Sequence, residues 1–425
     1  MKKYLAIALT LVMVLTMVAC ASTPAAEPAA EPAAPAAEPA AEPAAEPAAE
    51  PAATGGKPRV GVILVHDENS GYDLAHIEGI KGAMSTLGIA DSEVVFKYNI
   101  PEDETCYDTA VDLAEQGCEI IFSDSYGHQS HMMAAAAEYP DVTFVACTGD
   151  TAALEPVDNV ANMFPFTFQS RYVSGVVAGM KLKELMDAGT VKDPHVGYVG
   201  AYPYAEVVSG YTAFFLGIRS IVPEAYMDVQ YTNSWYDPVA EGEAARALIG
   251  KGCVIIGQHA DSTGAPSEVQ AQLDAGKVAY SVGYNIDMLS VAPKAALTSA
   301  QNNWVALYTP TLDKFLKGEA IPKDLALGYA DDAVMISALG ESCAAGTAEK
   351  VAEVIAGLKD GSVQVFDTAN FTVKGEKITT YAWQDTDGDF VGDSGEAIVD
   401  GIFQESVFRS APYFGLRIDG ITELN

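Results

Sequence analysis

The fold is decided by the stretch PRVGVILVHDENSGYDLAHIEGIKGAMSTLG, residues 58–88. Its first eight residues are rich in β-branched side chains, which predicts a strand. Apolar side chains then recur at helical spacing over 72–88, which predicts a helix. The polar segment HDENSGYD joins the two. A strand, a loop and a helix in this order make the repeating unit of a mostly parallel sheet covered by helices.

The same unit recurs in two successive series. In the first, the strands EVVFKYN, EIIFSDS and DVTFVAC alternate with helices at 106–117 and about 129–138. After an irregular crossing at about 150–168, the second series has helices at 169–187, 205–221, 238–250 and 266–275 and the strands HVGYVGA, YMDVQYT, CVIIGQ and VAYSVGY. The later segments AALTSA, 302–317, DLALGYADDAVMIS and 346–359 are enough for the chain to cross between the two series again.

Two series of this kind predict an α/β fold of two Rossmann-like lobes with mostly parallel sheets, joined by a multi-crossing hinge. Lobe 1 is expected to contain residues 57–165 plus about 290–330. Lobe 2 is expected to contain 166–289 plus about 331–425. About 370 residues are enough for two lobes, each with its own core.

The first twenty residues predict a lipoprotein signal peptide. Lys2 and Lys3 precede an apolar core from Leu5 to Val18, and a small residue precedes Cys20, as in the lipobox of bacterial lipoproteins. An ordinary secretory peptide is the alternative. Residues 21–56 repeat Glu-Pro-Ala-Ala units and predict a disordered tether. We therefore expect a protein anchored to the cell membrane by lipid on Cys20, facing the extracytoplasmic side.

Composition limits the possible partners and metals. A net charge of -34 with only 24 Lys and Arg excludes nucleic-acid binding, which needs clustered positive charge. The cysteines after Cys20 lack the paired spacing of a zinc site. They are interpreted as small core residues, although Cys106 and Cys118 could form a disulfide outside the cell.

Ligand contacts are expected in the loops that follow the strands, because open α/β sheets bind ligands beyond the carboxyl ends of their strands. These loops contain aromatic side chains together with uncharged or acidic polar groups, as in SDSYGHQ, TNSWYDP and GQHADSTG. This composition favours a neutral, flat ligand that forms hydrogen bonds. It disfavours an anion.

One of these loops holds His259, Asp261 and Ser262 within four positions. They are the residue types of a hydrolase triad, but a triad needs groups that converge from separate elements. The loop follows the strand CVIIGQ and precedes a helix whose start is marked by Pro266. We interpret the three side chains as hydrogen-bonding groups for a ligand, with a solvated loop and helix cap as the alternative.

Several motifs in order carry a resemblance to a known family. They are YPDVTFVACTGD (139–150), RYVSGVVAGMKLKE (171–184), NSWYDPVAEGEAARALI (233–249) and the run from VIIGQHADSTGAP to VAYSVGYNIDMLSVAPKAALTSAQNNW (254–304). Together they resemble the basic membrane protein (BMP) family, and its purine-binding branch in particular. The resemblance implies the type I periplasmic-binding-protein fold. It also implies a substrate-binding lipoprotein that delivers a purine nucleobase or nucleoside to the permease and ATPase subunits of an ABC importer.

The resemblance gives the loop residues expected roles. Trp235 would stack on the heterocycle, and Tyr72 and Tyr126 are candidates for its opposite face. His259, Asp261 and Ser262 would bind its polar edge, and Asp287 could bind a ribose hydroxyl or hold the hinge. Arg171 could pair with a cleft carboxylate or form a structural salt bridge. The candidate ligand-binding residues are Tyr72, Ser125, Tyr126, Trp235, Asp237, His259, Asp261, Ser262 and Asp287.

Two other functions stay open from the sequence. One is a binding protein for a sugar or a signalling ligand on the same fold. The other is an anchored hydrolase that uses Ser262 or Ser125, which the absence of a G-x-S-x-G motif and of a P-loop disfavours. We expect a protein that is not an enzyme and needs no cofactor for its function.

A possible structural calcium site lies near the end of the chain, in DTDGDFVGDSGE at 385–396. Oxygen-bearing side chains occupy positions 1, 3, 5, 9 and 12 of a calcium-type loop. They are Asp385, Asp387, Asp389, Asp393 and Glu396. Position 6 is Phe390, where an EF-hand needs glycine, and no flanking helix is predicted. A β-hairpin with an acidic turn is the alternative.

Overall fold

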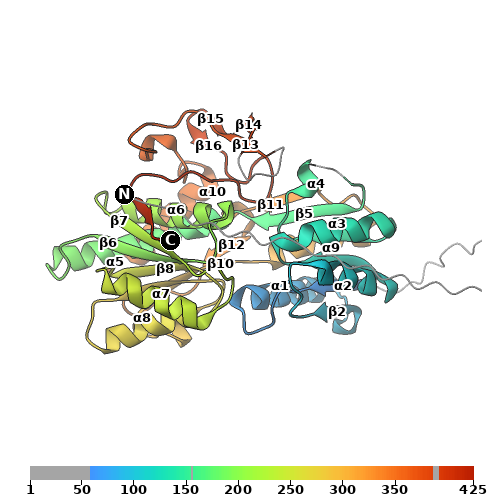
Figure 1. Ribbon diagram of the computed structural model, residues 1–425, viewed down its shortest axis with the longest axis horizontal. Coiled ribbons are helices and arrows are strands. Elements are labelled where there is room, and N and C mark those ends of the chain that lie inside the picture. The colour runs from blue at the N-terminus through green and yellow to red at the C-terminus, as the bar shows by residue number, and fades with distance from the viewer. Residues whose placement is uncertain (1–57, 155–156, 386–391) are drawn as a thin grey trace, which may run out of the picture. The chain divides into compact units, whose positions relative to one another are not determined.

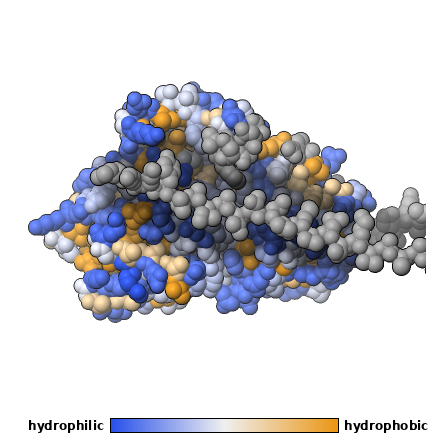
Figure 2. Space-filling model, viewed as in Figure 1, coloured by the Kyte–Doolittle hydropathy of each residue, from blue (hydrophilic) through white to orange (hydrophobic). Residues whose placement is uncertain are grey.

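Two mostly parallel sheets organise the chain, as the repeated strand and helix units predict. A computed structural model describes residues 58–154, 157–385 and 392–425 (Figure 1). The predicted signal peptide, Cys20 and the predicted tether lie outside these residues. Among the helices that are described, none is long and apolar enough to span a membrane. On the face shown in Figure 2, hydrophilic residues predominate and apolar residues form small separate patches.

The first sheet is parallel throughout its described pairs and takes most of its strands from the first series. From edge to edge it contains β11 (Asp324–Leu327), β5 (Val160–Pro165), β4 (Thr143–Ala146), β3 (Cys118–Ser123), β1 (Arg59–Ile63) and β2 (Val94–Lys97). Its helices are α1 (Gly71–Leu87), α2 (Glu104–Glu115), α3 (Gln129–Glu138), the short α4 (Thr151–Leu154) and α9 (Val305–Leu316).

The second sheet follows the second series and is parallel except for the pair that includes its edge strand β12. In order it contains β12 (Val334–Ile336), β10 (Ala296–Asn302), β9 (Tyr280–Tyr284), β8 (Ile255–His259), β6 (His195–Gly200), β7 (Tyr226–Tyr231) and β17 (Ile421–Glu423). Its helices are α5 (Thr167–Asp187), α6 (Ala205–Arg219), α7 (Pro238–Gly250), α8 (Gly264–Asp274) and α10 (Thr347–Asp360).

Within the described residues, the chain passes between the two sheets three times. The passages follow β5, β10 and β11. The predicted boundary at about 290 is displaced to the end of β10, because residues 296–302 pair with β9 in the second sheet. The run AALTSA was a correct strand prediction, but neighbouring strands decide which sheet a strand joins, and the sequence of one strand does not show its neighbours.

Helix ends follow local side-chain chemistry. The Ser70 hydroxyl accepts a hydrogen bond from the Asp73 N–H at the start of α1, and Gly88 ends that helix with a φ of 65°. At α7, Asp237 caps the helix and Pro238 occupies its first turn. The helix α8 begins at Gly264, two residues before Pro266, so proline lies inside the first turn.

Strand alternation builds a separate core on each face of each sheet. In β3, Ile120 and Phe122 pack under α1 and α9, whereas Ile121 packs under α2 and α3. In β8, Ile255 faces the layer of α5, α6 and α10, and Ile256 faces α7 and α8. Since side chains alternate between the two faces of a strand, both faces of each sheet can be buried.

The residues after α10 form an additional layer beside the second sheet. The orange and red part of the ribbon in Figure 1 lies along one side of the molecule and reaches toward α4 and β11. It holds two small antiparallel pairs, β13 (Ala382–Gln384) with β14 (Ser394–Glu396) and β15 (Ile398–Val399) with β16 (Ile402–Phe403). Phe366, Phe403 and Phe414 join the core of the second sheet.

Four of the five described cysteines are buried core residues, as expected, and Cys343 is partly buried against the core of the second sheet. Cys106 and Cys118 are buried free thiols in the core beneath α2 and α3, so the possible disulfide between them does not form. Burial raises the pKa of the Cys106 thiol to about 12 and that of the Cys118 thiol to about 11. Both are therefore kept in the unreactive thiol form.

Close contact between α5 and α6 depends on glycine, and this can be tested. A Cβ at Gly175 would collide with the backbone carbonyl oxygen of Phe214. We expect Gly175→Ala to lower the free energy of unfolding by about 1 to 3 kcal/mol, measured by urea denaturation. Gly250→Ala is the matched control, since a Cβ there meets open space. Equal stability of the two variants would contradict the packing argument.

Candidate functional site

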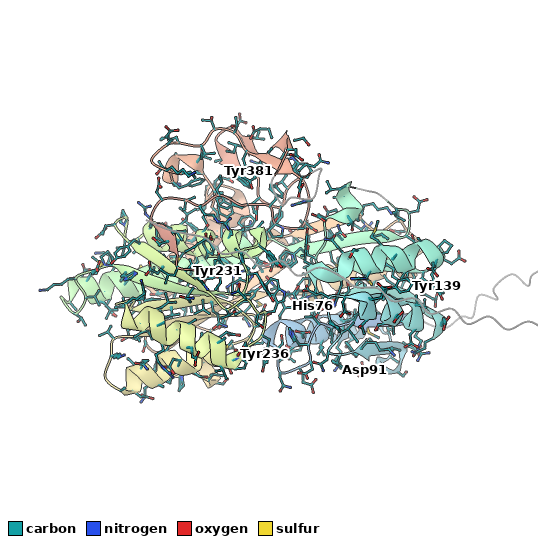
Figure 3. The ribbon with its side chains drawn as sticks, in the orientation of Figure 1. His76, Asp91, Tyr139, Tyr231, Tyr236 and Tyr381 are labelled. Atoms are coloured by element: carbon teal, nitrogen blue, oxygen red, sulfur yellow. The ribbon has the colours of Figure 1, made fainter. Side chains whose placement is uncertain are left out.

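A cleft lies between the carboxyl ends of the two sheets, with about 380 Å³ of empty space that includes space open to solvent. It is lined from the first sheet by Val65, Tyr72, Asp124, Ser125, Tyr126 and Thr148. It is lined from the second sheet by Glu206, Trp235, His259, Asp261 and Tyr284. In Figure 3, His76 and Tyr236 mark the facing edges of the two halves.

Six of the nine predicted ligand-binding residues line this cleft. They are Tyr72, Ser125, Tyr126, Trp235, His259 and Asp261. Trp235 and His259, which the ligand hypothesis requires to share one space, do so. Their binding role stays a prediction, but their placement is the one that the hypothesis requires.

The other three predicted residues cap helices and do not line the cleft. The Asp237 carboxylate accepts hydrogen bonds from the N–H groups of residues 239 and 240 at the start of α7. The Ser262 hydroxyl accepts from the Gly264 N–H at 3.0 Å, and Asp287 accepts from the Leu289 N–H at 2.8 Å. Short polar side chains at helix starts satisfy backbone donors, and this local role accounts for all three.

Aromatic side chains face the cleft from both sheets. The Tyr72 hydroxyl donates to the Cys147 carbonyl at 3.1 Å, which fixes the ring on the first sheet. The Trp235 ring meets Tyr202 edge-on, with centroids 5.2 Å apart, and Tyr204 lies on its outer side at 6.1 Å. Because both rings are held by neighbours, they present preformed flat surfaces to a ligand.

Carboxyl groups crowd the same space, and the residue-by-residue prediction missed Asp124 and Glu206. Burial, with Asp73 beside it, raises the pKa of Asp124 well above its usual range. Burial raises the pKa of Asp261 in the same way, with the charges of Asp73 and Glu241 adding to it. Burial also raises the pKa of Glu206 to about 7. These shifts favour neutral carboxyl groups, which can both donate and accept hydrogen bonds.

His259 and Glu206 form a pair inside the second sheet's half of the cleft. The His259 Nε2 lies 3.2 Å from the Glu206 Oε1, and burial together with the Arg171 charge lowers the pKa of His259 well below its usual range. A neutral imidazole that donates through Nε2 fits this contact. The imidazole is thus held neutral, whereas Glu206, with a pKa of about 7, is only partly ionised near neutral pH.

Arg171 supplies a buried positive charge behind the cleft. Its guanidinium carbon lies 3.5 Å from the centre of the Tyr284 ring, and Nη1 donates to the Gln258 carbonyl at 2.6 Å. The described contacts give Arg171 no salt bridge, so neither predicted pairing forms. Its charge favours the ionised form of Glu206 and opposes the effect of burial on that carboxyl.

The two halves touch directly beside the cleft. The Gly71 N–H at the start of α1 donates to the Asp261 carbonyl at 2.9 Å, which joins the two halves directly. The rings of His66 and Tyr236 meet nearby, with centroids 5.7 Å apart. A ligand in the cleft would therefore lie between the two halves, next to these contacts.

Comparison with known proteins identifies this arrangement. A family model described as "ABC transporter substrate-binding protein PnrA-like" matches residues 61–366. The chain belongs to this family, Bmp. The match confirms the family resemblance found in the sequence motifs, and it places the protein among the extracytoplasmic binding components of ABC transporters.

Individual relatives of the Bmp protein are named for different ligands. A purine-binding protein of Brucella abortus is 32% identical over 263 residues, which cover 62% of this chain and 70% of that protein. A putative ABC transporter glucose-binding protein of Haloferax volcanii is 35% identical over 205 residues, 48% of each chain. A solute-binding protein structure from Aeropyrum pernix K1 covers 72% of this chain and 92% of its own, with a TM-score of 0.61 and 16% identity. That likeness confirms the predicted α/β fold.

The Bmp family and fold are those of transporter substrate-binding proteins, so the protein is not an enzyme. The side chains agree with this assignment. The Ser125 hydroxyl donates to Glu102 at 2.5 Å, and Ser262 is engaged by the α8 backbone. Among the described contacts, neither serine is bonded to His259, whose Nε2 faces Glu206. A triad needs that serine–histidine contact.

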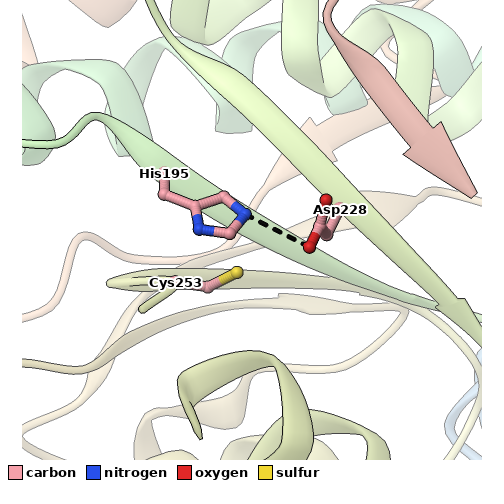
Figure 4. Close-up of side chains that lie close together, drawn as sticks. All are labelled: His195, Asp228 and Cys253. Atoms are coloured by element: carbon pink, nitrogen blue, oxygen red, sulfur yellow. Dashed lines mark ion pairs between the residues drawn. The ribbon is translucent and has the colours of Figure 1, made fainter. Parts of the chain in front are cut away.

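Outside the cleft, His195, Asp228 and Cys253 of the Bmp protein form a buried cluster (Figure 4). The His195 Nε2 lies 3.3 Å from the Asp228 Oδ2, and the Lys251 ammonium lies 3.4 Å from the same oxygen. Cys253 donates to the Val196 carbonyl, and burial raises the pKa of its thiol to about 12. The described contacts of the Asp228 carboxylate are therefore an ion pair with Lys251 and the contact with His195.

The predicted calcium loop is only partly described. Asp387 and Asp389 lie outside the described residues, whereas the strands β13 and β14 flank the loop on either side. The Glu396 Oε1 accepts hydrogen bonds from the N–H groups of residues 381 and 398. The antiparallel pairing of β13 and β14 agrees with the hairpin alternative. Calcium binding stays a prediction.

The raised pKa of Glu206 predicts a pH-dependent stability. Its pKa is about 7 in the folded chain against an ordinary value of 4.5, so its contribution is fully present below pH 4.5 and is lost as the pH rises through about 7. The free energy of unfolding of the wild type should fall between pH 5 and pH 8. We expect Glu206→Gln to make that fall smaller, by on the order of 1 to 3 kcal/mol. Denaturant titration at both pH values measures it.

The exposed Glu243 on α7 provides the control for this experiment. Glu243→Gln should leave the pH dependence of the wild type unchanged. If Glu206→Gln and the wild type lose stability in parallel between the two pH values, the assigned burial of Glu206 is wrong.

Proposed function

We propose that this Bmp-family protein captures a purine nucleobase or nucleoside in the cleft and delivers it to the permease and ATPase subunits of an ABC importer. One observation carries the proposal. Aromatic rings fixed on opposite sheets, Tyr72 and Trp235, line a single cleft in which burial favours the neutral forms of Asp124 and Asp261. The purine-binding relative supports the same ligand class.

The chemistry of the lining matches a purine. A flat heterocycle gains about 1 to 3 kcal/mol from stacking on an aromatic side chain. Its edge carries both donors and acceptors, and neutral carboxyl groups can pair with either. Buried polar groups that are left without partners cost about 1 to 3 kcal/mol each, so the same groups select against ligands with the wrong pattern.

The lining also argues for a base or nucleoside over a nucleotide. The residues that line the cleft include Asp124, Glu206 and Asp261 but no lysine or arginine. A phosphate would enter a space rich in acidic groups without a cation to pair with it, and an unpaired buried charge is strongly unfavourable. AMP should therefore bind far more weakly than adenosine.

A sugar is the second candidate, and the glucose-binding relative favours it. Carboxyl groups and an aromatic face can also hold a hexose. Calorimetry on the mature chain with adenosine, guanosine, hypoxanthine, AMP, ribose and glucose separates the two candidates. We expect micromolar or tighter binding of at least one purine base or nucleoside. Tight binding of glucose with no response to any purine would replace the purine proposal by the sugar one.

The stacking role of Trp235 gives a quantitative prediction. Trp235→Ala should weaken purine binding by about 1 to 3 kcal/mol, and Trp235→Phe should recover part of that loss of binding free energy. Tyr98→Ala is the control, because Tyr98 is 40% exposed and lies away from the cleft lining. The same calorimetric titration measures all three. An affinity unchanged in Trp235→Ala would remove the indole from the binding site.

We also propose that lipid on Cys20 anchors the protein to the cell membrane, with residues 21–56 as the tether. Expression of the full chain in a bacterium should place it in the membrane fraction, with a lipid-modified Cys20 at its start by mass spectrometry. Cys20→Ser should move it to the soluble fraction, whereas Cys343→Ser should not. An unmodified chain cleaved elsewhere would support an ordinary secretory peptide instead.

A further inference from the structure

The end of the chain contributes an element beyond the family match, which stops at residue 366. Its last strand β17 extends the second sheet beside β7, with Ile421 opposite Met227. Phe403 and Phe414 pack against each other with ring centroids 4.7 Å apart, inside the core of the second sheet. The segment is therefore built into the second half of the molecule.

From this base, residues 403–414 reach the first half. The Arg409 Nη1 lies 2.8 Å from the Asp150 Oδ2, in the loop after β4. The Ser410 N–H donates to the Asp324 Oδ2 at 2.9 Å, on the edge strand β11 of the first sheet. The side chains of Arg409 and Asp150 are only 9% and 15% exposed, so solvent screens their attraction little.

The carboxylate that receives Arg409 is also a support of the cleft. The Tyr126 hydroxyl donates to the same Oδ2 of Asp150 at 3.0 Å, and Tyr126 lines the cleft. Gln129 accepts from the Asp150 N–H at 2.8 Å, which fixes the loop from the other side. A single oxygen therefore links a C-terminal cation to an aromatic side chain of the cleft.

The segment holds Arg409 ready for this contact. The Tyr413 hydroxyl donates to the Gln404 carbonyl, which closes the loop on itself, and the Arg409 guanidinium lies 5.6 Å from the Tyr413 ring. The buried Glu405 accepts from the Tyr413 N–H at 3.4 Å. Since the loop is ordered by its own contacts, little conformational entropy remains to be lost when Arg409 meets Asp150.

We propose that Arg409 is a positioning residue, and that residues 403–414 form a latch which holds the two halves closed and fixes Tyr126 through Asp150. The three passages between the sheets let the halves rotate about a hinge. The latch adds a noncovalent connection, besides the Gly71–Asp261 hydrogen bond and the His66–Tyr236 contact. Opening that moves Asp150 relative to the second sheet takes the carboxylate away from the largely buried Arg409 guanidinium, which is unfavourable while that guanidinium stays buried.

Hydrogen exchange without ligand tests the latch, so the result does not depend on purine binding. Mature chains of the wild type, Arg409→Gln, Arg409→Lys and Arg417→Gln are compared by mass spectrometry. We expect Arg409→Gln to speed exchange by at least about fivefold in peptides that cover 124–130 and 148–152. Arg409→Lys should restore most of the protection, because it keeps the charge.

Arg417→Gln is the matched control. Arg417 also pairs with a carboxylate, Glu423 at 3.0 Å, but both belong to the C-terminal segment and stay on the second half. Its substitution should leave the peptides of the first half unchanged. Unchanged exchange in Arg409→Gln at 124–130 and 148–152, or equal acceleration in Arg417→Gln, would overturn the latch.

A second variant approaches the contact from the other side. Asp150→Asn removes the charge that receives Arg409 and leaves the C-terminal segment intact. It should accelerate exchange at 403–414 and at 124–130 by a similar factor. If Arg409→Gln speeds exchange throughout the core, the test rests on Asp150→Asn. Faster exchange confined to peptides 403–414 and 124–130 then supports the latch. Exchange at the wild-type rate in these peptides rejects it.

Discussion

Parallel strands bring every loop that follows a strand to the same edge of a sheet, and in this chain two such edges face each other across one cleft. This geometric constraint brings together residues as distant in the sequence as Tyr72 and Tyr284. It also concentrates polar groups where water is scarce. The site therefore follows from the direction of the strands before any property of an individual side chain is considered.

Electrostatics then limits what such a site can hold. The chain carries a net charge of -34, and several of its acidic groups end inside the cleft. Buried carboxylates this close together cannot all be ionised without a large desolvation cost. Arg171 lies behind them, and its position against Tyr284 gives it no carboxylate partner among the described contacts. Neutral carboxyl groups satisfy this constraint, and a neutral ligand does not disturb it.

The strand and helix pattern was sufficient to predict the fold from the sequence. The β-branched runs became the parallel strands of two sheets, and the helix predictions at 129–138 and 238–250 match α3 and α7. The error at residues 296–302 arose because strand order is a long-range property. β10 joins the second sheet through its neighbour β9, and its own residues carry no sign of that pairing.

Site residues were predicted correctly where placement at the end of a strand is enough to bring the side chain into the cleft. They were predicted wrongly where backbone N–H groups at a helix start compete for the side chain, or where only burial in the folded chain identifies it. Trp235 and His259 follow strands and point into the cleft, as strand-end residues should. Asp237 and Asp287 also follow strands, but each precedes a helix turn whose free N–H groups its carboxylate satisfies. Asp124 and Glu206 stand in strand-end segments too, and only tertiary burial distinguishes them from solvated acids.

The C-terminal latch would affect the equilibrium between the open and closed forms of the cleft. A ligand shifts an equilibrium between open and closed forms only by its differential affinity for the two. If Arg409 and Asp150 already favour the closed form, less of the ligand's binding energy is consumed in closing the cleft, so affinity rises. The same contact must break before the ligand leaves. A transporter that receives the ligand therefore has to favour the open form by enough to separate Arg409 from Asp150. Since the segment is anchored in the second half and Asp150 lies in the first, a stronger Arg409–Asp150 ion pair would favour capture and a weaker one release, alongside the Gly71–Asp261 hydrogen bond.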